Sequence, residues 1–238
     1  MAEGSTGRKA HQLPPGRHGL SRTFVVRNQR DRILQAVAEC VYDSGFAQMS
    51  VEDVVTRAGI SRRTFYEQFA NKDEAFLAAF DEAAAQLLAG VRSAYAGERS
   101  FPARVIAGYR AFLELLALSP EFANMCIVEV LAAGPTAVGK RTAVMHEFAL
   151  LIHDNAHQAR RGKPIPLLTA ETIVGGVYET IFRKIAADRS RELPELLPDV
   201  VEFTLLPYIG DRRARTAAAA VRDAALAEKP AATPADAV

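Results

Sequence analysis

A short segment of the chain concentrates side chains that recognise other molecules through directed hydrogen bonds. Arg62 and Arg63 are adjacent, and Thr64, Tyr66 and Gln68 add hydroxyl and amide groups. An arginine guanidinium can donate two parallel hydrogen bonds to the O6 and N7 atoms of guanine in the major groove of DNA. These residues therefore indicate a surface that reads the edges of DNA bases. The alternative is an ordinary surface helix with two solvated arginines.

Two short amphipathic helices would position these side chains. The first, residues 51–58, repeats apolar residues at helical spacing, and the second, residues 61–69, places Phe65 and Phe69 one turn apart. Gly59 between them can take the left-handed conformation that ends a helix. A helix, a glycine-containing turn and a second helix make up the helix-turn-helix unit of DNA-binding proteins.

Polar residues mark where these helices begin. Ser50 is the expected N-cap of the first helix, with Asp53 as its capping-box partner, and Ser61 is the expected N-cap of the second. A third helix is expected to begin at Lys72 after Asn71, which places the Lys72 ammonium within reach of a phosphate. The residues expected to contact DNA are Arg17, His18, Ser50, Ser61, Arg62, Arg63, Thr64, Tyr66, Gln68 and Lys72.

Arg17 and His18 belong to an arm, residues 1–27, which is rich in Gly, Pro and Arg and lacks helical periodicity. An extended arm of about ten residues reaches roughly 30 Å. Narrow A·T-rich minor grooves attract inserted arginine and histidine side chains. We therefore expect the arm to dock in a minor groove beside the site that the helix-turn-helix reads. The alternative is a tail that makes no specific contact.

Several motifs combine in one ungapped block. They read S-V-E-D-V-V, A-G-I-S, T-F-Y-E-Q-F and N-K-D-E-A-F, after an amphipathic helix that ends at Ser44-Gly45-Phe46. The block, Arg32 to Phe80, resembles the DNA-binding domain of the TetR-like (tetracycline-repressor/AcrR) family of transcription regulators. The resemblance implies an all-α fold, with an N-terminal three-helix helix-turn-helix DNA-binding domain and a C-terminal helical ligand-binding and dimerisation domain. It also implies a homodimer built from the C-terminal helices of each chain.

Helical periodicity and caps divide the chain into four parts. These are an arm (1–27), a DNA-binding domain (28–72), a ligand-binding and dimerisation domain (73–228) and a disordered tail (229–238). The first helix is expected over 28–44. In the larger domain we expect helices that start at Lys72, at Pro102 after the cap Ser100, at Pro120 after the cap Ser119, after Gly134-Pro135, after the cap Thr169, at Pro194 and at Asp211.

The helices expected at 169–188 and 194–208 carry dense apolar faces that include Val177 and Leu205. Gly175-Gly176 in the middle of the former permits a close approach of another helix. The resemblance implies that these helices form a four-helix bundle with their copies. The alternative is that they complete the core of one chain.

Apolar and aromatic residues on the middle helices favour a cavity for a small apolar effector. The residues expected to line it are Tyr109, Phe112, Phe122, Met125, Glu129, Phe148, Ile152, Tyr178 and Phe182. For each of them a plain core position is the alternative. His146, His153 and His157 share one side of a helix, but no third metal ligand is evident beside the last two unless Glu129 supplies it, so solvated histidines are expected and no metal.

Composition agrees with a DNA-binding regulator. Residues 1–72 hold 11 Lys and Arg against 7 Asp and Glu, whereas the rest of the 238-residue chain is slightly acidic. Cys40 and Cys126 lie far apart, and neither a signal peptide nor a membrane-spanning run is evident, so we expect a reduced, cytoplasmic protein without a membrane partner. No nucleophile elbow, phosphate loop, dinucleotide fingerprint or zinc-protease motif occurs, so neither an enzyme nor a cofactor is expected.

The sequence therefore predicts a dimeric transcription regulator that binds a double-stranded DNA operator, a repressor released by a small apolar effector. The alternative is a protein of the same fold that binds or converts a small molecule and has lost specific DNA binding. Arg62, Arg63 and the basic arm favour the regulator.

Overall fold

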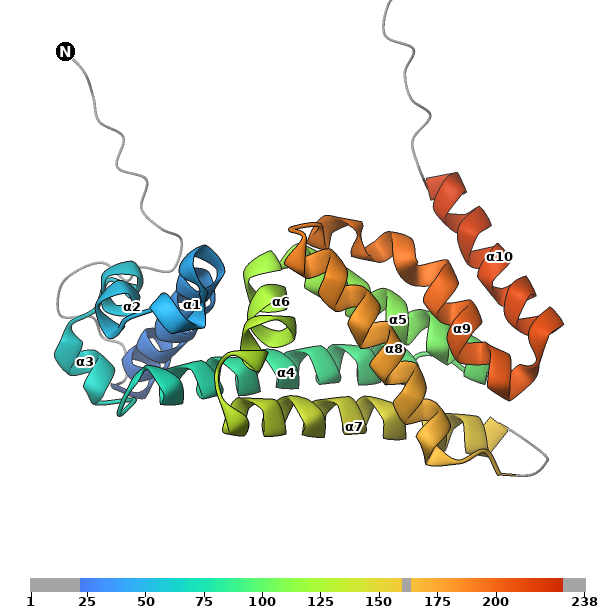
Figure 1. Ribbon diagram of the computed structural model, residues 1–238, viewed down its shortest axis with the longest axis horizontal. Coiled ribbons are helices and arrows are strands. Elements are labelled where there is room, and N and C mark those ends of the chain that lie inside the picture. Colours follow the sequence, from blue (N-terminus) through green and yellow to red (C-terminus); the bar gives the residue numbers. More distant parts are fainter. Residues whose placement is uncertain (1–21, 160–163, 229–238) are drawn as a thin grey trace, which may run out of the picture. The chain divides into compact units, whose positions relative to one another are not determined.

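The computed structural model describes residues 22–159 and 164–228, and these ranges contain helices and loops but no strand. The all-α prediction is confirmed. The chain forms two compact units, and the boundary between them falls between Ala79 and Phe80. Figure 1 labels the helices of both units.

The first unit covers the segment in which the sequence predicts a DNA-binding domain. It contains α1 (Arg22–Gln48), α2 (Val51–Ala58), α3 (Arg62–Tyr66) and the first residues of α4 (Lys72–Ala96). Apolar residues at helical spacing make its core, and these are Ile33, Val37 and Val41 of α1, Val54 of α2, Phe65 of α3, Phe69 and Phe76. The ring of Phe76 packs edge-on against Phe46, with 4.9 Å between the centroids.

The start of α1 differs from the prediction. The helix begins at Arg22, so residues 22–27, which were expected to belong to the arm, are helical. At its other end the regular helix stops at Gly45, as predicted, because the backbone there is not helical, with a φ of 77° in the region that favours glycine. A short helical segment follows and continues to Gln48.

The predicted caps of the first unit are present. Ser50 and Asp53 form a reciprocal capping box at the start of α2, and Gly59 ends it with φ 63° and ψ 45°. The Ser61 hydroxyl accepts a hydrogen bond from the Thr64 backbone N–H at 3.1 Å. The second helix was predicted to extend to residue 69, but α3 ends at Tyr66 and a turn follows it.

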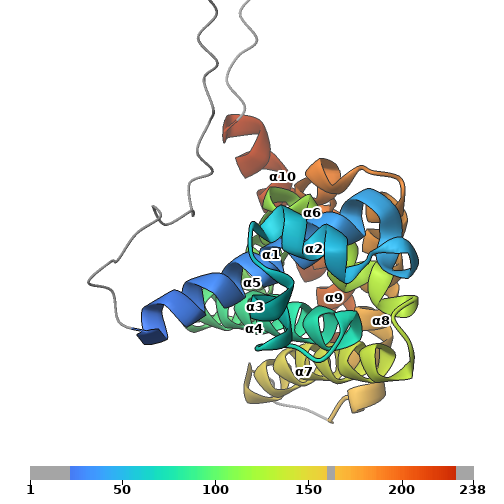
Figure 2. The same cartoon turned by 90° about the vertical axis from the view of Figure 1, so that its left-hand side faces the viewer.

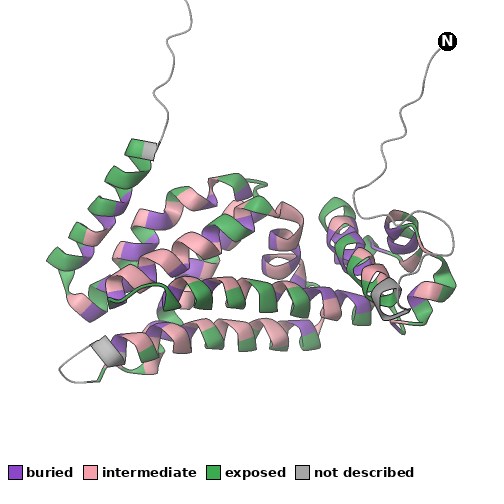
Figure 3. Cartoon of the chain, turned by 180° about the vertical axis from the view of Figure 1, so that it is seen from behind, coloured by how far each residue is buried: buried purple, intermediate pink, exposed green. Residues whose placement is uncertain are grey.

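The second unit contains the rest of α4 and six further α-helices. These are α5 (Phe101–Leu118), α6 (Pro120–Ile127), α7 (Pro135–Ala159), α8 (Leu167–Ala186), α9 (Leu197–Ile209) and α10 (Asp211–Glu228), with short 3₁₀ turns η1 (Glu129–Leu131) and η2 (Ser190–Leu196). Figures 1 and 2 both show α7 beside α8. Figure 3 shows buried positions recurring along each helix while exposed ones occupy the opposite face.

Two surface salt bridges link α4 to α7. The Lys140 ammonium lies 2.7 Å from a carboxylate oxygen of Asp81, and Arg92 lies 2.6 Å from Glu147. The second pair lies later in the sequence of both helices than the first, so α4 and α7 run parallel. Their facing sides therefore form two long walls of one space.

Helix α6 starts at Pro120 after the N-cap position Ser119, as predicted, although the Ser119 side chain makes no capping hydrogen bond. The helix ends at Ile127, and η1 follows it. Two other predicted helix starts in this unit are wrong. Thr169 lies inside α8, which starts after Pro166. The proline ring fixes the φ angle of the residue before the helix, so α8 can start after Pro166 without a capping side chain that accepts a hydrogen bond. The segment expected to open the 194–208 helix is η2, and Pro198 instead occupies the first turn of α9.

No single helix among the described residues is long and apolar enough to cross a membrane. The pair formed by α5 with Pro120–Leu131 meets the length and composition test jointly, but it is bent by 108°.

Candidate nucleic-acid interface and effector cavity

Helix α3 separates a buried side from an exposed one. Phe65 is completely buried and packs against Phe69 with 5.7 Å between the ring centroids. The side chains of Arg62 and Arg63 are 65% and 88% exposed, and Tyr66 is 53% exposed. The aromatic core thus holds the helix and leaves both predicted base-reading arginines outside.

Each of these arginines has an acidic neighbour. Arg62 Nε lies 3.3 Å from Glu52 Oε2, and Arg63 Nε donates to Glu67 Oε1 at 2.9 Å. Exposed ion pairs of this kind contribute about 0–1 kcal/mol each. A bidentate contact to a base contributes about 1–3 kcal/mol of discrimination. The pairs therefore orient the guanidinium groups without preventing them from exchanging a carboxylate for a base.

The hydroxyls that were expected at DNA are engaged within the protein. Ser50 Oγ donates to Asp53 Oδ2 at 2.6 Å, and the hydroxyls of Ser61 and Thr64 lie 2.9 Å apart. Thr64 and Gln68 are half-buried. The DNA contacts of these residues stay predictions.

Lys72 has a structural role that the sequence prediction missed. Its ammonium donates to the backbone carbonyls of Phe46, Ala47 and Met49 at 3.1, 3.1 and 2.9 Å. It also lies 4.9 Å from the centre of the Phe46 ring. The last carbonyls of a helix have no partner inside that helix, so Lys72 satisfies the end of α1. Its three donors are occupied, which leaves none for a phosphate in this arrangement.

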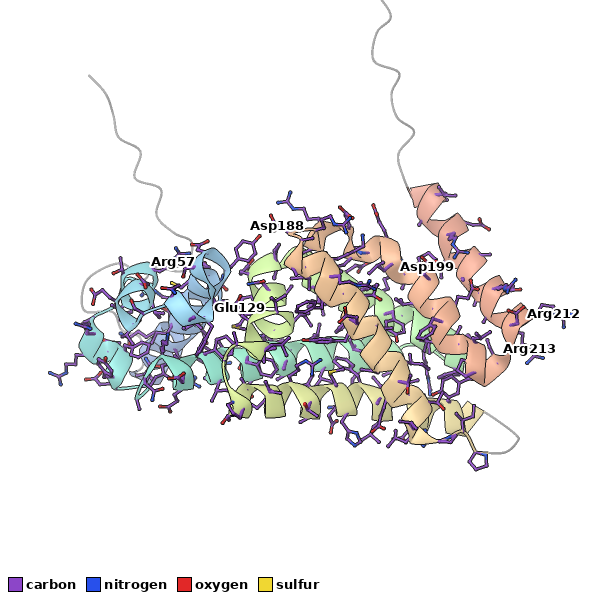
Figure 4. All side chains as sticks on the ribbon, in the orientation of Figure 1. Arg57, Glu129, Asp188, Asp199, Arg212 and Arg213 are labelled. Carbon is purple, nitrogen blue, oxygen red and sulfur yellow. The ribbon has the colours of Figure 1, made fainter. Side chains whose placement is uncertain are left out.

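Two arginines that were not singled out from the sequence join α1 to α2. Arg32 Nη2 donates to the carbonyls of Ala58 and Gly59, the latter at 2.8 Å. Arg57, which Figure 4 labels, lies 2.6 Å from an Asp43 carboxylate oxygen. They fix the angle at which α2 leads into the turn and α3. The predicted arm contacts, Arg17 and His18, lie outside the described residues.

The second unit encloses an apolar cavity of about 90 Å³. Five helices contribute to its walls: α4, α5, α6, α7 and α8. Of the residues predicted to line it, five do so, namely Tyr109, Phe112, Phe148, Ile152 and Tyr178. The rings of Phe112 and Phe148 meet edge-on with 5.3 Å between their centroids.

The other predicted residues, Phe122, Met125, Glu129 and Phe182, are not part of the cavity wall. Met125 is completely buried in the core, and Phe182 stacks against Tyr178 from the next turn of α8, with 6.5 Å between ring centroids. Figure 4 places Glu129 on η1, the short turn after α6. The helix break at Val128 was not predicted, and it changes which residues of this segment face inward.

Cavity-lining residues that the sequence analysis missed include one face of α4, represented by Ala84, Leu87 and Val91, and the side chains of Cys126 and Arg141. The spacing of the α4 residues was visible in the sequence as a helical stripe. Arg141 could not be found that way, because charged residues on a helix normally face water.

The polar groups of the cavity are mostly satisfied. Thr204 Oγ1 donates to the Tyr109 hydroxyl at 2.9 Å, and the Tyr178 hydroxyl donates to the carbonyl of Ile127. Burial raises the pKa of Tyr109 and that of the Cys126 thiol, each to about 12. Both groups are therefore neutral near pH 7, and the thiol is unreactive because the thiolate is the nucleophile.

His146 of α7, one of the three histidines noted in the sequence, pairs with a carboxylate of α8. His146 Nδ1 lies 3.3 Å from Glu171 Oε1, and both side chains are substantially exposed. The side chain of His157 lies outside the described residues. Within the described part of the chain, no group of three His, Cys, Asp or Glu side chains has an arrangement that could hold a metal ion.

A separate apolar surface lies on α8 and α9. Phe203 and Leu206 of α9 are 50% and 43% exposed. A Cβ built on Gly176 of α8 would lie 3.6 Å from the Phe203 ring, so the glycine adjoins this surface. Val177 and Leu205, which the sequence suggested for a dimer contact, are buried in the core of one chain instead.

Comparison with known proteins agrees with this architecture. The family model described as bacterial regulatory proteins, tetR family, matches residues 33–79. The chain is 24% identical over 163 residues to the HTH-type transcriptional activator FasR of Mycolicibacterium smegmatis, which covers 66% of this chain and 74% of that protein.

Solved structures share the fold at low sequence identity. The fatty acid degradation regulator FadR from Bacillus halodurans has a TM-score of 0.66 and 19% identity, over 74% of this chain and 96% of that one. FadR from Bacillus subtilis in complex with stearoyl-CoA has a TM-score of 0.65 and 17% identity, over 76% and 98%. Residues 33–79 thus resemble the DNA-binding domain of tetR-family regulators, and the chain as a whole shares its fold with solved regulators.

Proposed function

We propose that the protein is a dimeric repressor that a long, apolar effector releases from its operator. The observation that carries this proposal is the cavity in the second unit, whose walls are almost entirely aliphatic and aromatic. Such walls bind an apolar molecule through burial of its surface, at about 25 cal/mol per Å².

The dimensions of the cavity favour a slender ligand. Its wall on α4 extends from Phe80 to Tyr95, which is about 22 Å at the helical rise of 1.5 Å per residue. This long, apolar wall suits an unbranched chain better than a compact ring system. The stearoyl-CoA in the structure of the Bacillus subtilis regulator supports an acyl chain as the ligand class.

DNA recognition is assigned to the exposed face of α3. Arg62 and Arg63 are the base-reading candidates, and Tyr66 is exposed beside them. The first residues of a recognition helix normally enter the major groove. Docking of Arg17 and His18 in an adjoining minor groove remains part of the proposal.

The dimer is assigned to the exposed surface of α8 and α9. Two copies would bury Phe203 and Leu206, and a dimer reads two half-sites about one helical turn of DNA apart. Gly175 of α8 has nothing within 4 Å of a built Cβ, and the same is true of Gly139 on α7. Gly175→Leu should therefore block association, whereas Gly139→Leu, the matched control, should not.

An effector can shift the equilibrium only if it binds the DNA-free form more tightly than the DNA-bound form. Helix α4 contributes Lys72 to the DNA-binding unit and Ala84, Leu87 and Val91 to the cavity wall. This continuity supports a route by which occupancy of the cavity changes DNA affinity.

The test is a mobility-shift titration of the full-length protein on the promoter fragment beside its own coding region. We expect a shifted complex that survives excess unrelated DNA and dissociates when palmitoyl or stearoyl compounds are added. A complex that tightens on addition, with increased transcription in vitro, would mean an activator, as the name of the Mycolicibacterium smegmatis relative states for that protein. Stabilisation by small polar metabolites alone would contradict an apolar effector.

A further inference from the structure

Arg141 of α7 is a charged residue in the wall of the apolar cavity. Its side chain is half-buried. Its Nε atom is buried and has no hydrogen-bond partner among the described residues. A buried donor without a partner costs about 1–3 kcal/mol, and more when it is charged.

Contacts with an aromatic ring hold the guanidinium in place. Its central carbon lies 3.9 Å from the centre of the Tyr178 ring, a cation–π distance. The Tyr178 hydroxyl donates to the Ile127 carbonyl, and the Tyr109 hydroxyl accepts from Thr204. The two tyrosine hydroxyls therefore have partners inside the protein, whereas Arg141 keeps an unused donor.

No carboxylate lies within ion-pair distance of Arg141 in the described parts of the chain. Its neighbour Lys140, by contrast, pairs with Asp81 at 2.7 Å. A guanidinium presents a planar fork of donors that matches a carboxylate or phosphate. The missing counter-charge is thus of the kind that an anionic ligand would bring.

We propose that Arg141 binds the anionic head group of the effector while the apolar chain occupies the cavity, which makes Arg141 the residue that selects acyl anions over neutral lipids. This inference rests on the proposed function of the cavity as the effector site. The shared chemistry is an anion attached to a long chain, and two sources supply it: the carboxylate of a free fatty acid and the phosphates of an acyl-CoA.

The experiment measures binding of three ligands with one chain length to the full-length protein by displacement of a fluorescent fatty-acid probe. Palmitate carries a carboxylate, palmitoyl-CoA carries phosphates, and methyl palmitate is neutral. Arg141→Met removes the charge and keeps an apolar contact with the Tyr178 ring. The matched control, Lys140→Met, removes a neighbouring charge that pairs with Asp81 on the surface. Circular dichroism checks that each variant is folded.

A second control addresses unspecific attraction of anions. Arg212 and Arg213 lie at the start of α10, are exposed, and extend outward in Figure 4. Neither of them lines the cavity. Their replacement by Gln removes two positive charges from the same unit without changing the proposed site.

We expect Arg141→Met to lower the affinity for at least one of the two anionic ligands about 10- to 100-fold, as the loss of a charged hydrogen bond would. Methyl palmitate should change by less than about threefold, and the Lys140 and Arg212/Arg213 variants should behave as the unaltered protein does. The anion that loses affinity identifies the source of the head group.

Three results would overturn the inference. Equal losses for the neutral ester and the anions would mean that Arg141 only packs against Tyr178. A larger loss in the Arg212/Arg213 variant would place the head group at α10. Equal affinity of the unaltered protein for all three ligands would remove the selectivity but leave the cavity as the chain site. If no chain binds the unaltered protein, the proposed effector site fails as well.

Discussion

Gly108 on α5 allows a sharp test of how the cavity wall is packed. A Cβ added there would lie 2.0 Å from Cε2 and 2.5 Å from Cδ2 of Tyr95. Non-bonded carbons normally approach to about 3.5–4.0 Å. The Tyr95 ring, which is only 6% exposed, would therefore have to retreat by roughly 1.5 Å.

The magnitude of the effect combines two opposite contributions. Replacing Gly by Ala inside a helix stabilises it by about 0.5–1 kcal/mol. Overpacking a core typically costs about 1–3 kcal/mol, and a rigid ring with little space belongs near the upper end. Gly108→Ala should therefore lower the free energy of unfolding by about 1–2 kcal/mol.

A matched substitution separates these contributions. Gly139 is also inside a helix, and nothing lies within 4 Å of a Cβ built on it. Gly139→Ala should raise the free energy of unfolding by up to about 1 kcal/mol. Urea unfolding followed by far-ultraviolet circular dichroism, at one protein concentration, measures both. If Gly108→Ala is as stable as Gly139→Ala, the Tyr95 ring is not a fixed wall and the reasoning is wrong.

A double-mutant cycle adds a second check. In a Tyr95→Ala background the clash is absent, so Gly108→Ala should then stabilise by up to about 1 kcal/mol. The coupling between the two sites should amount to about 2–3 kcal/mol, as expected for residues in contact.

Three further outcomes concern DNA binding, assembly and the end of α1. Arg62→Ala or Arg63→Ala should weaken the free energy of binding to the specific operator by about 1–3 kcal/mol and relax base preference, whereas the exposed Arg92→Ala is the control. An unchanged operator affinity in the double Arg62/Arg63 variant would contradict the role of α3. Phe203→Asp should yield monomers by light scattering and abolish operator binding, and a dimer that persists would place the interface elsewhere. Lys72→Met should lower the free energy of unfolding by about 1–3 kcal/mol because three carbonyls lose a charged donor, while a loss confined to DNA affinity would restore the phosphate role.

The DNA-binding unit was predictable because its information is local. Ser50 with Asp53, Gly59 and Ser61 lie within a few residues of the helix ends that they control. The helical spacing of apolar residues identified Phe65 as a core residue, and burial of its ring leaves the neighbouring arginines exposed. Helix caps and the spacing of buried residues along one helix can be read directly from the sequence.

The cavity was only partly predictable because its walls come from distant segments. Aromatic residues of α5, α7 and α8 were identified by type, yet whether one lines a void or fills the core depends on neighbours far along the chain. Met125 and Phe182 have suitable chemistry and pack elsewhere. The break after Ile127 and the inward position of Arg141 arise from tertiary packing, for which the sequence contains no local signal.

Basic residues show why a count of charges is a weak guide to a DNA interface. Arg32 and Lys72 donate to backbone carbonyls, and Arg57 pairs with carboxylates of α1. These positive charges stabilise the first unit from within. Arg62 and Arg63 carry the same charge, but their carboxylate partners are exposed and weak, so only such residues can exchange a partner for a base or phosphate. The net positive charge of residues 1–72 therefore includes charges that are engaged within the protein, and the exposed face of α3 carries the two arginines that we propose for sequence recognition.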